Sequence, residues 1–313
     1  MTTLSRIDTT SGQVTLVGQV GVVEQSESGL MGMAFHPAFD AQPFVYLAYS
    51  YSAQNGIANR LVRMRYDGVS LGDEEVLLGT IPGARNHDGS RLVIGPDSLI
   101  YMTTGDAQVT ALAQDLSSLA GKVLRFTLEG QPAPSNPFGT AVYSFGHRNP
   151  QGLVFHPITG LLYSTEHGPS DNDEVNQILA GRNYGWPEVH GFCDNDVLST
   201  ERAFCLANDV AEPLVVWTPT IAPSGADIYV ADLIPQWKGS LLFTTLRGSA
   251  LVRLALSEDG SRVTEQEMLY ERRYGRLRDV LVGPRGEVYL ATSNRDGRGN
   301  PVADDDRILR IAP

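Results

Sequence analysis

The sequence contains no apolar run approaching the roughly 20 residues that span a bilayer, which predicts a protein without a membrane span. It is short of positive charge, with 24 Lys and Arg against 36 Asp and Glu. The net charge of −12 repels phosphate backbones, so nucleic acid is not an expected partner, although simple solubility also accounts for the charge. Residues 1–13 lack the basic and apolar pattern of a secretion signal. The chain is therefore cytoplasmic if Met1 is native, or its leader has been removed.

Sequence motifs for several common chemistries are also missing. The chain has no P-loop, no GxGxxG after a predicted strand, no GxSxG turn and no HExxH. Cysteine is scarce, and Cys193 and Cys205 lie 12 positions apart in one polar loop. We interpret them as a disulfide that fastens this loop in an oxidising compartment, with two free thiols as the alternative.

Glycine and proline are plentiful, which favours many short strands joined by tight turns. The chain has 32 Gly and 18 Pro, with 42% hydrophobic and 19% charged residues, a balance typical of a globular protein with an ample core. At about 150 residues per domain, the length suggests two domains, but a fold that repeats one all-β unit around an axis forms larger single domains. We expect residues 1–313 to form a single all-β domain.

One pattern recurs along the chain: an apolar strand, a tight turn, a second apolar strand and a loop rich in Gly and Asp. It occupies residues 29–37, 90–101, 152–163, 224–229 and 279–290. The spacing of roughly 55–70 residues is longer than a common blade repeat and requires long loops. A third type of strand, with alternating apolar and basic residues, follows at residues 61–68, 122–126, 250–254 and 307–311. This alternation predicts an outer strand with one buried and one exposed face.

The repeat predicts a β-propeller with four-stranded antiparallel blades. Five units are visible, and a sixth is half present: residues 4–8 resemble the third strand of a blade and residues 14–20 the fourth, but the inner hairpin that should precede them is absent. We predict six blades, with the first blade incomplete at the N-terminus. A five-bladed propeller with a decorated edge is the alternative. Function is expected where loops converge at one mouth of the central channel.

Oxygen-rich turns after residue 146 indicate a cation site. The segment Gly146-His-Arg-Asn-Pro-Gln-Gly is followed by Glu166-His-Gly-Pro-Ser-Asp-Asn-Asp-Glu-Val-Asn and by Asn183-Tyr-Gly-Trp-Pro. A Gly-Pro turn exposes backbone carbonyls, and acidic residues follow it closely. These are the oxygen ligands that calcium selects. The spacing does not match an EF-hand, and an acidic turn with solvated charges is the alternative.

A second group of residues joins a histidine to a carboxylate. His87 stands in Arg85-Asn-His-Asp-Gly-Ser-Arg-Leu, and Asp106 ends the paired strand of the same hairpin in Thr103-Thr-Gly-Asp. A histidine that a carboxylate orients is suited to act as a general base. An ordinary surface histidine is the alternative.

A third group gathers arginines in an acidic protein. Arg276 and Arg278 share one strand face in Tyr274-Gly-Arg-Leu-Arg-Asp, and Arg148 and Arg247 add to them. Guanidinium pairs with carboxylate in a bidentate fork, so the set suits an anionic cofactor with several carboxylates. Local pairing with Asp and Glu is the alternative.

Taken in order, these segments resemble the soluble quinoprotein glucose and aldose sugar dehydrogenases, the glucose/sorbosone dehydrogenase family. The resemblance runs from about residue 27 to the C-terminus and rests on residues 146–152, 168–176, 183–187, 87–92 and 276–279. It implies a six-bladed propeller that holds pyrroloquinoline quinone (PQQ) and calcium and oxidises the C1 hydroxyl of an aldose to a lactone. It also implies a sugar substrate, an external electron acceptor, a monomer or homodimer, and a periplasmic or secreted location.

The resemblance assigns roles to individual residues. His87 would take the proton of the sugar C1 hydroxyl, Asp106 would hold its imidazole, and Arg148 would polarise the C5 oxygen of the quinone. The other expected quinone contacts are Glu27, Asn86, Asn149, Arg247, Arg276 and Arg278.

Two calcium sites are also implied by the resemblance. The carbonyls of Gly168 and Pro169 would bind the calcium that contacts the quinone, where it acts as a Lewis acid and a template. The ligands of a second, structural calcium would be Asp173, Asp194 and the carbonyls of Glu174 and Tyr184. A Cys193–Cys205 disulfide would stiffen the loop that carries Asp194.

The sequence departs from the glucose enzymes at several places. Asn86 replaces an aspartate, Arg247 replaces a lysine, and Glu27 stands about where a glutamine is expected. Gln114 is a loose candidate for a further quinone contact, and long insertions are missing. These departures indicate the broader aldose dehydrogenase branch with loose sugar specificity. Two other functions stay open: a non-catalytic ligand- or protein-binding propeller of the same fold, and a calcium-dependent lactonase.

Overall fold

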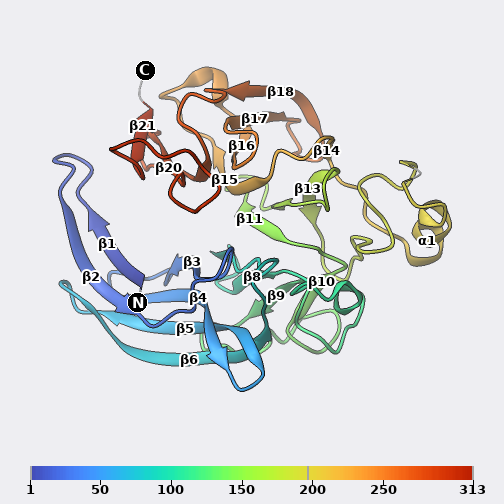
Figure 1. The fold of residues 1–313 in the computed structure, drawn as a ribbon, viewed down its shortest axis with the longest axis horizontal. Coiled ribbons are helices and arrows are strands. Elements are labelled where there is room, and N and C mark those ends of the chain that lie inside the picture. The colour runs from blue at the N-terminus through green and yellow to red at the C-terminus, as the bar shows by residue number, and fades with distance from the viewer. Residues whose placement is uncertain (1, 196, 312–313) are drawn as a thin grey trace. The chain divides into compact units, whose positions relative to one another are not determined.

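The computed structural model describes residues 2–195 and 197–311, which are mostly antiparallel β-structure (Figure 1). The chain divides into two compact units, residues 1–143 and residues 144–313. In both units, strands that are neighbours in sequence pair with one another to form meanders. Each such meander is a propeller blade, so the predicted all-β propeller class is confirmed.

Unit 1 holds a blade formed by its first long meander. Its strands, in spatial order, are β3 (Leu30–Phe35), β4 (Phe44–Ala53), β5 (Gly56–Tyr66) and β6 (Leu71–Pro82). The next sheet consists of β7 (Leu92–Ile94), β8 (Ile100–Thr104), β9 (Lys122–Phe126) and β10 (Val142–Phe145). A short 3-10 helix, η1 (Thr110–Ala113), lies in the loop between β8 and β9. This loop and the segment before β7 carry the histidine and carboxylate of the predicted site.

The N-terminal strands do not build part of a sixth blade, so the predicted blade number is wrong. Among the described residues, the strands β1 (Thr2–Ile7) and β2 (Val14–Val20) form a two-stranded sheet of their own. Leu4 and Val20 are buried in the apolar cluster of the β3–β6 blade, beside residues such as Leu47. Two strands without an inner hairpin bury most apolar surface by packing on a neighbouring sheet. The part of the chain that the structure describes therefore has five blades. This agrees with the alternative prediction of a five-bladed propeller with a decorated edge.

Unit 2 holds the other meanders. The first is β11 (Pro150–Phe155), β12 (Leu162–Glu166), β13 (Asp173–Ile178) and β14 (Val215–Trp217), and α1 (Glu201–Asn208) lies in its long last loop. The second is β15 (Pro223–Tyr229), β16 (Ser240–Thr245), β17 (Leu251–Leu256) and β18 (Val263–Leu269), with η2 (Pro235–Trp237) after β15. The third has three strands, β19 (Leu277–Val282), β20 (Val288–Thr292) and β21 (Ile308–Ile311). The prediction of four strands in every blade fails for this last sheet.

The strands predicted from the repeat are present. The paired apolar segments fall on β3, β7–β8, β11–β12, β15 and β19–β20, and the alternating segments fall on β5, β9, β17 and β21. The expectation of an exposed basic face is wrong for β9, where Lys122 is 0% exposed and Arg125 is 8% exposed. Both cations have polar partners inside the fold. Lys122 Nζ donates to three backbone carbonyls, and Arg125 Nε donates to Asn136 Oδ1 at 2.9 Å.

Glycines on inner strands let neighbouring blades approach within each unit. A Cβ added at Gly32 of β3 would overlap the carbonyl oxygen of Ser90, just before β7. A Cβ added at Gly152 of β11 would overlap the side chain of Thr165 and the carbonyl of Ser224 on β15. The repeated glycine in the predicted hairpins therefore serves close backbone packing between inner strands.

Asp227 links two blades of unit 2. Its Oδ2 accepts the N–H of Val282 on β19 at 2.7 Å, and its Oδ1 accepts the N–H of Ile228 at 2.8 Å. Burial raises the pKa of Asp227 from 3.8 to about 6, with a smaller contribution from the charge of Asp279. The fold therefore favours the protonated carboxyl over the charged one.

We expect this carboxyl to make stability fall as pH rises. Between pH 4 and pH 6 the folded state binds the proton that the unfolded state has lost, so the free energy of unfolding should drop by about 3 kcal/mol from this group. Asp227→Asn removes the titration. Urea unfolding of both proteins at pH 4 and pH 7 measures the effect. The free energy of unfolding of the variant, relative to that of the wild type, should be higher at pH 7 than at pH 4. A pH-independent difference would contradict the assignment.

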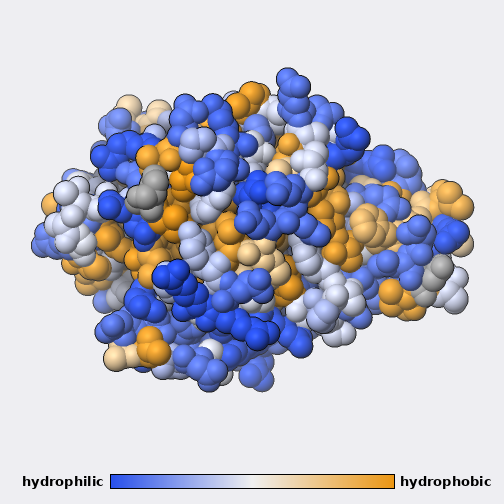
Figure 2. All heavy atoms as spheres, turned by 90° about the horizontal axis from the view of Figure 1, so that it is seen from above, coloured by the Kyte–Doolittle hydropathy of each residue, from blue (hydrophilic) through white to orange (hydrophobic). Residues whose placement is uncertain are grey.

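Hydrophilic residues predominate on the face drawn in Figure 2, and apolar residues form separate groups among them. In residues 2–195 and 197–311, no helix is long and apolar enough to cross a membrane.

Candidate active site

The predicted histidine and carboxylate meet in unit 1. His87 Nδ1 lies 2.8 Å from Asp106 Oδ1, and Asp106 is 0% exposed. An ionised carboxylate only accepts hydrogen bonds, so the pair places the proton of the neutral imidazole on Nδ1. The lone pair of Nε2 is then available as a base, and the side chain of His87 keeps 18% of its surface exposed.

The backbone around this pair is shaped by close approach of two loops. His87 has a positive φ of 65°, and its carbonyl accepts the N–H of Ala107 at 3.1 Å. A Cβ at Gly105 would overlap the carbonyl of His87, so this position requires glycine. The Thr-Thr-Gly-Asp sequence thus lets the two loops touch main chain to main chain. Gln108 N–H also donates to Asp106 Oδ1, at 2.8 Å, which fixes the carboxylate.

Two predicted cofactor contacts of unit 1 lie beside His87. Glu27 Oε2 accepts the N–H of His87 at 3.2 Å, and the N–H of Glu27 donates to Arg85 O at 2.9 Å. Asn86 Oδ1 accepts the hydroxyl of Ser26 at 2.6 Å. The structure therefore brings Glu27 and Asn86 to the loop that carries His87.

Sequence reasoning missed the aspartate that follows His87. Asp88 is 1% exposed, and its Oδ1 accepts Asn59 Nδ2 at 2.8 Å and the N–H of Ala84 at 3.0 Å. Burial raises the pKa of Asp88. Its position directly after His87 in the sequence was the signal that could have identified it. Its hydrogen bonds hold the loop 84–88 on strand β5.

Lys122 was also missed, because its alternating strand pattern predicts exposure. Its Nζ donates to the carbonyls of Leu112, Ala113 and Ala120 at 2.7, 3.0 and 2.6 Å. Its backbone N–H donates to Thr104 Oγ1 at 3.0 Å, two residues before Asp106. Lys122 therefore fastens the segment that contains η1 and Gln114, the loose quinone candidate, to the hairpin that ends in Asp106.

In unit 2, Glu166 shapes the turn that carries Arg148 and Asn149. Its Oε1 accepts the N–H of Arg148 and the N–H of Asn149, the latter at 3.2 Å. The Arg148 guanidinium donates to His167 O at 3.2 Å and lies 5.2 Å from the ring centre of Trp186. Arg148 lines a small hollow together with Gly168 and Pro169. The predicted quinone contact and the predicted calcium carbonyls therefore lie together.

Asn149 and Arg278 are connected through a shared glutamine. Asn149 is fully buried, and its Oδ1 accepts Gln151 Nε2 at 3.2 Å. Gln151 Oε1 in turn accepts Arg278 Nη1 at 3.3 Å. Gln151 lies in the predicted motif at residues 146–152, but the sequence alone indicated no role for it.

Arg276 and Arg247 line a different hollow of unit 2, with a volume of about 480 Å³. Arg276 pairs with Asp296, with Nε and Nη2 at 2.9 and 2.8 Å from one carboxylate oxygen. The arginines that line this cavity are Arg247, Arg272, Arg273, Arg276, Arg298 and Arg307, against the single acid Asp305. Such a cavity fits an anion with several carboxylates.

The chemistry of the turn after β12 fits a cation through its carbonyls. A Cβ at Gly168 would overlap the carbonyl oxygens of Asp171 and Asn172, so oxygens crowd the space beside this glycine. Backbone oxygens in a tight turn are hard ligands of the type that calcium prefers. Among residues 2–195 and 197–311, no group of three His, Cys, Asp or Glu side chains is arranged to hold a metal.

The expected side-chain ligand Asp173 is already occupied by protein donors. Its Oδ1 accepts the N–H of Gly168 at 2.9 Å. Its Oδ2 accepts Thr220 Oγ1 and the N–H groups of Ile221 and Ala222 at 2.6, 2.7 and 2.8 Å. This buried carboxylate holds the calcium-type turn to the start of β15, so its arrangement fits a structural anchor better than a cation ligand.

The other residues predicted to bind the second calcium lie in different environments. Glu174 Oε1 accepts the N–H of Gly191 at 2.9 Å, and burial raises the pKa of Glu174 to about 8, with Glu166 adding to the effect. Tyr184 O–H donates to Gln177 O at 2.6 Å. Asp194 is exposed in the following loop. The second calcium therefore stays a prediction.

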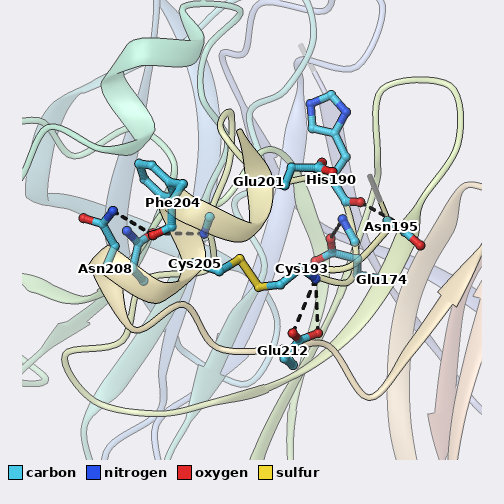
Figure 3. The surroundings of a disulfide bond; sticks show 12 residues. Glu174, His190, Cys193, Asn195, Glu201, Phe204, Cys205, Asn208 and Glu212 are labelled. Carbon is cyan, nitrogen blue, oxygen red and sulfur yellow. Dashed lines mark hydrogen bonds between the residues drawn. A yellow bond between two sulfur atoms is a disulfide. The ribbon is translucent and has the colours of Figure 1, made fainter. Parts of the chain in front are cut away.

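Cys193 and Cys205 form the predicted disulfide (Figure 3). The bond joins the loop after Gly191 to helix α1, and Glu212 accepts the N–H of Cys193 at 3.4 Å. Figure 3 shows Glu201 beside His190, whose N–H donates to Glu201 Oε1 at 2.9 Å. Covalent and hydrogen-bonded contacts thus replace the apolar burial that a polar loop cannot provide.

Removing the disulfide should cost stability. The bond closes a loop across 12 positions, and the chain-entropy estimate for such a loop is about 3 kcal/mol. Cys193→Ser with Cys205→Ser should lower the free energy of unfolding by this order, as measured by urea titration. Dithiothreitol should lower the melting temperature of the wild type and leave the double variant unchanged. Equal responses of both proteins would contradict the expectation.

Several known proteins are similar to this chain over most of its length. The family model for glucose/sorbosone dehydrogenase matches residues 2–309. The PQQ-bound aldose sugar dehydrogenase of Streptomyces coelicolor is 38% identical, with a TM-score of 0.86 over 99% of this chain and 87% of its own. Quinoprotein glucose dehydrogenase B of Acinetobacter calcoaceticus is 31% identical over 96% of this chain and 80% of its own. An aldose sugar dehydrogenase of Escherichia coli is 30% identical over 95% and 81%.

These matches confirm the predicted family and, with it, the prediction of an oxidoreductase. Both the sequence relatives and the solved structure are named as sugar dehydrogenases. Because the family model matches residues 2–309, almost the whole of the chain, the chain belongs to the glucose/sorbosone dehydrogenase family.

Proposed function

We propose that this protein is a calcium-dependent quinoprotein sugar dehydrogenase that oxidises the C1 hydroxyl of aldoses to the lactone. The observation that carries the proposal is the 2.8 Å contact between His87 Nδ1 and the buried Asp106 carboxylate. It supports a base with a fixed tautomer in a family of dehydrogenases. PQQ, when bound, would accept the hydride that leaves C1.

His87 Nε2 takes the proton of the C1 hydroxyl as the hydride leaves, and Asp106 stabilises the imidazolium that forms. Glu27 and Asn86 help to hold the loop of His87 by the hydrogen bonds described above. The proton passes to solvent afterwards, and an external acceptor removes the two electrons in each turnover.

Arginines of unit 2 would bind and polarise the cofactor. Arg247 and Arg276 would bind its carboxylates from the cavity that they line, and Arg148 would donate to its reactive carbonyl oxygen. Arg278 and Asn149, which are joined through Gln151, would be further contacts. The carbonyls of Gly168 and Pro169 would hold calcium, which would supply a Lewis acid and a template.

Reconstitution tests the proposal. Purified protein is incubated with PQQ and calcium, and dye reduction is followed with a panel of aldoses and with sugar alcohols as controls. We expect a rate that requires the aldose, PQQ and calcium together, and a lactone as the product. A folded sample that binds PQQ but reduces no dye with any aldose would favour a non-catalytic binding protein. Lactone hydrolysis without PQQ would favour the lactonase.

A further inference from the structure

Ser144, His147 and Glu166 form a hydrogen-bonded series in unit 2 that the proposed reaction does not use. Ser144 Oγ lies 2.9 Å from His147 Nε2, and His147 Nδ1 lies 2.9 Å from Glu166 Oε2. Ser144 and His147 are 0% exposed, and Glu166 is 4% exposed. Glu166 can only accept when ionised, so the series reads as the Ser144 hydroxyl donating to Nε2 and the Nδ1–H donating to Glu166.

This order of groups is that of a hydrolase triad, but its burial argues against hydrolysis. A nucleophilic serine must reach an acyl carbon, and its base must later release a proton to the leaving group. Ser144 has no exposed surface, and the imidazole of His147 stacks on Tyr184 with ring centres 4.5 Å apart. The serine and imidazole therefore act on the protein itself rather than on a substrate.

The far oxygen of Glu166 shows what the series acts on. Its Oε1 accepts the N–H groups of both Arg148 and Asn149, while its Oε2 is held by His147. Glu166 ends β12 and pairs with Pro150 at the start of β11, so both ends of the turn are anchored. One carboxylate thus fixes two successive peptide groups of the segment 146–149, and His147 and Ser144 fix the carboxylate.

We propose that Glu166, held by His147 and Ser144, is a positioning residue for cofactor binding through Arg148 and Asn149. The inference rests on the proposed function, because it assumes that these two residues contact the quinone. Glu166 sets the backbone from which the Arg148 guanidinium reaches His167 O and the face of Trp186. Without it, the N–H groups of Arg148 and Asn149 lose their acceptor and the turn loses its fixed conformation.

The test is a double-mutant cycle on the affinity for PQQ, measured by absorbance titration in the presence of calcium. Glu166→Leu removes both acceptor oxygens at similar volume, so we expect the Kd of PQQ to rise by about 10-fold to 100-fold. In a background with Arg148→Ala and Asn149→Ala, the same substitution should change Kd by at most about 3-fold, because both residues through which it acts are gone. The KM for the sugar should stay unchanged in Glu166→Leu, since a general loss of structure would alter both.

A milder variant covers the case in which Glu166→Leu does not fold. Ser144→Ala removes the last hydrogen bond of the series and should raise the Kd of PQQ by about 2-fold to 10-fold. Ser164→Ala is the matched control, because Ser164 is equally buried on β12 and its hydroxyl has no partner among the described residues. Equal Kd values for the two serine variants, or additive effects in the cycle, overturn the inference. A wild type that does not bind PQQ overturns the proposed function as well.

Discussion

Replacing His87 with Asn should lower kcat by about 10³-fold while the Kd of PQQ stays within about 2-fold of the wild type. Asn places an amide nitrogen where Nδ1 stands, so the hydrogen bond to Asp106 at 2.8 Å has a replacement donor. It also tolerates the positive φ of 65° at this position. What it removes is the basic Nε2, which is the atom that the proposed reaction needs.

The control for this variant is His36→Asn. His36 lies in the same unit, and its Nδ1 accepts the N–H of Ala38 at 3.1 Å, an acceptor that the Asn side chain can supply. We expect its kcat to match the wild type. Stopped-flow reduction of bound PQQ by an aldose measures the step directly. If His87→Asn reduces PQQ at the wild-type rate, His87 is not the base. If it no longer binds PQQ, its role is structural.

Replacing Arg148 with Lys should lower kcat by about 10²-fold, although the charge is kept. The guanidinium donates to His167 O at 3.2 Å and lies 5.2 Å from the ring centre of Trp186. An ammonium group lacks the flat shape for this stacking and the forked donors for a carbonyl and a ligand at once. The donor to the reactive carbonyl of the cofactor is therefore misplaced.

Arg285→Lys provides the matched control, because Arg285 is exposed and pairs with Glu287 outside the candidate site. We expect no change in its kcat or in the Kd of PQQ. Steady-state kinetics with saturating PQQ, calcium and aldose separate kcat from binding. A wild-type kcat for Arg148→Lys would show that charge alone suffices, and that the guanidinium geometry has no part in the reaction.

Local patterns in the sequence were sufficient to predict the strands and the main pair of the site. Apolar runs with tight turns predicted hairpins such as β11–β12, because side chains alternate along a strand and glycine ends it. His87 and Asp106 lie at the ends of one predicted hairpin, so the pairing of two neighbouring strands brings them together. The disulfide was predicted for a similar reason, since its cysteines share one short loop.

Local sequence patterns were not sufficient to predict the number of blades. Segments 4–8 and 14–20 have the right period for blade strands, and they do form β1 and β2. Whether such strands join a new sheet or pack on an old one depends on the apolar surface that neighbouring sheets offer. Here Leu4 and Val20 are buried with residues of the β3–β6 blade, and that surface is assembled from distant parts of the chain.

The sequence by itself determined the strand order, the family and the identity of the residues that can do chemistry, because these depend on neighbours along the chain. Tertiary structure alone decided which polar groups are occupied. It gave Asp173 four protein donors, buried Lys122 under three carbonyls, and joined Ser144 to Glu166 through His147. Some of these partners lie far apart in sequence, such as Thr220 for Asp173 and Glu166 for His147, and they act only once the backbone has brought them within about 3 Å.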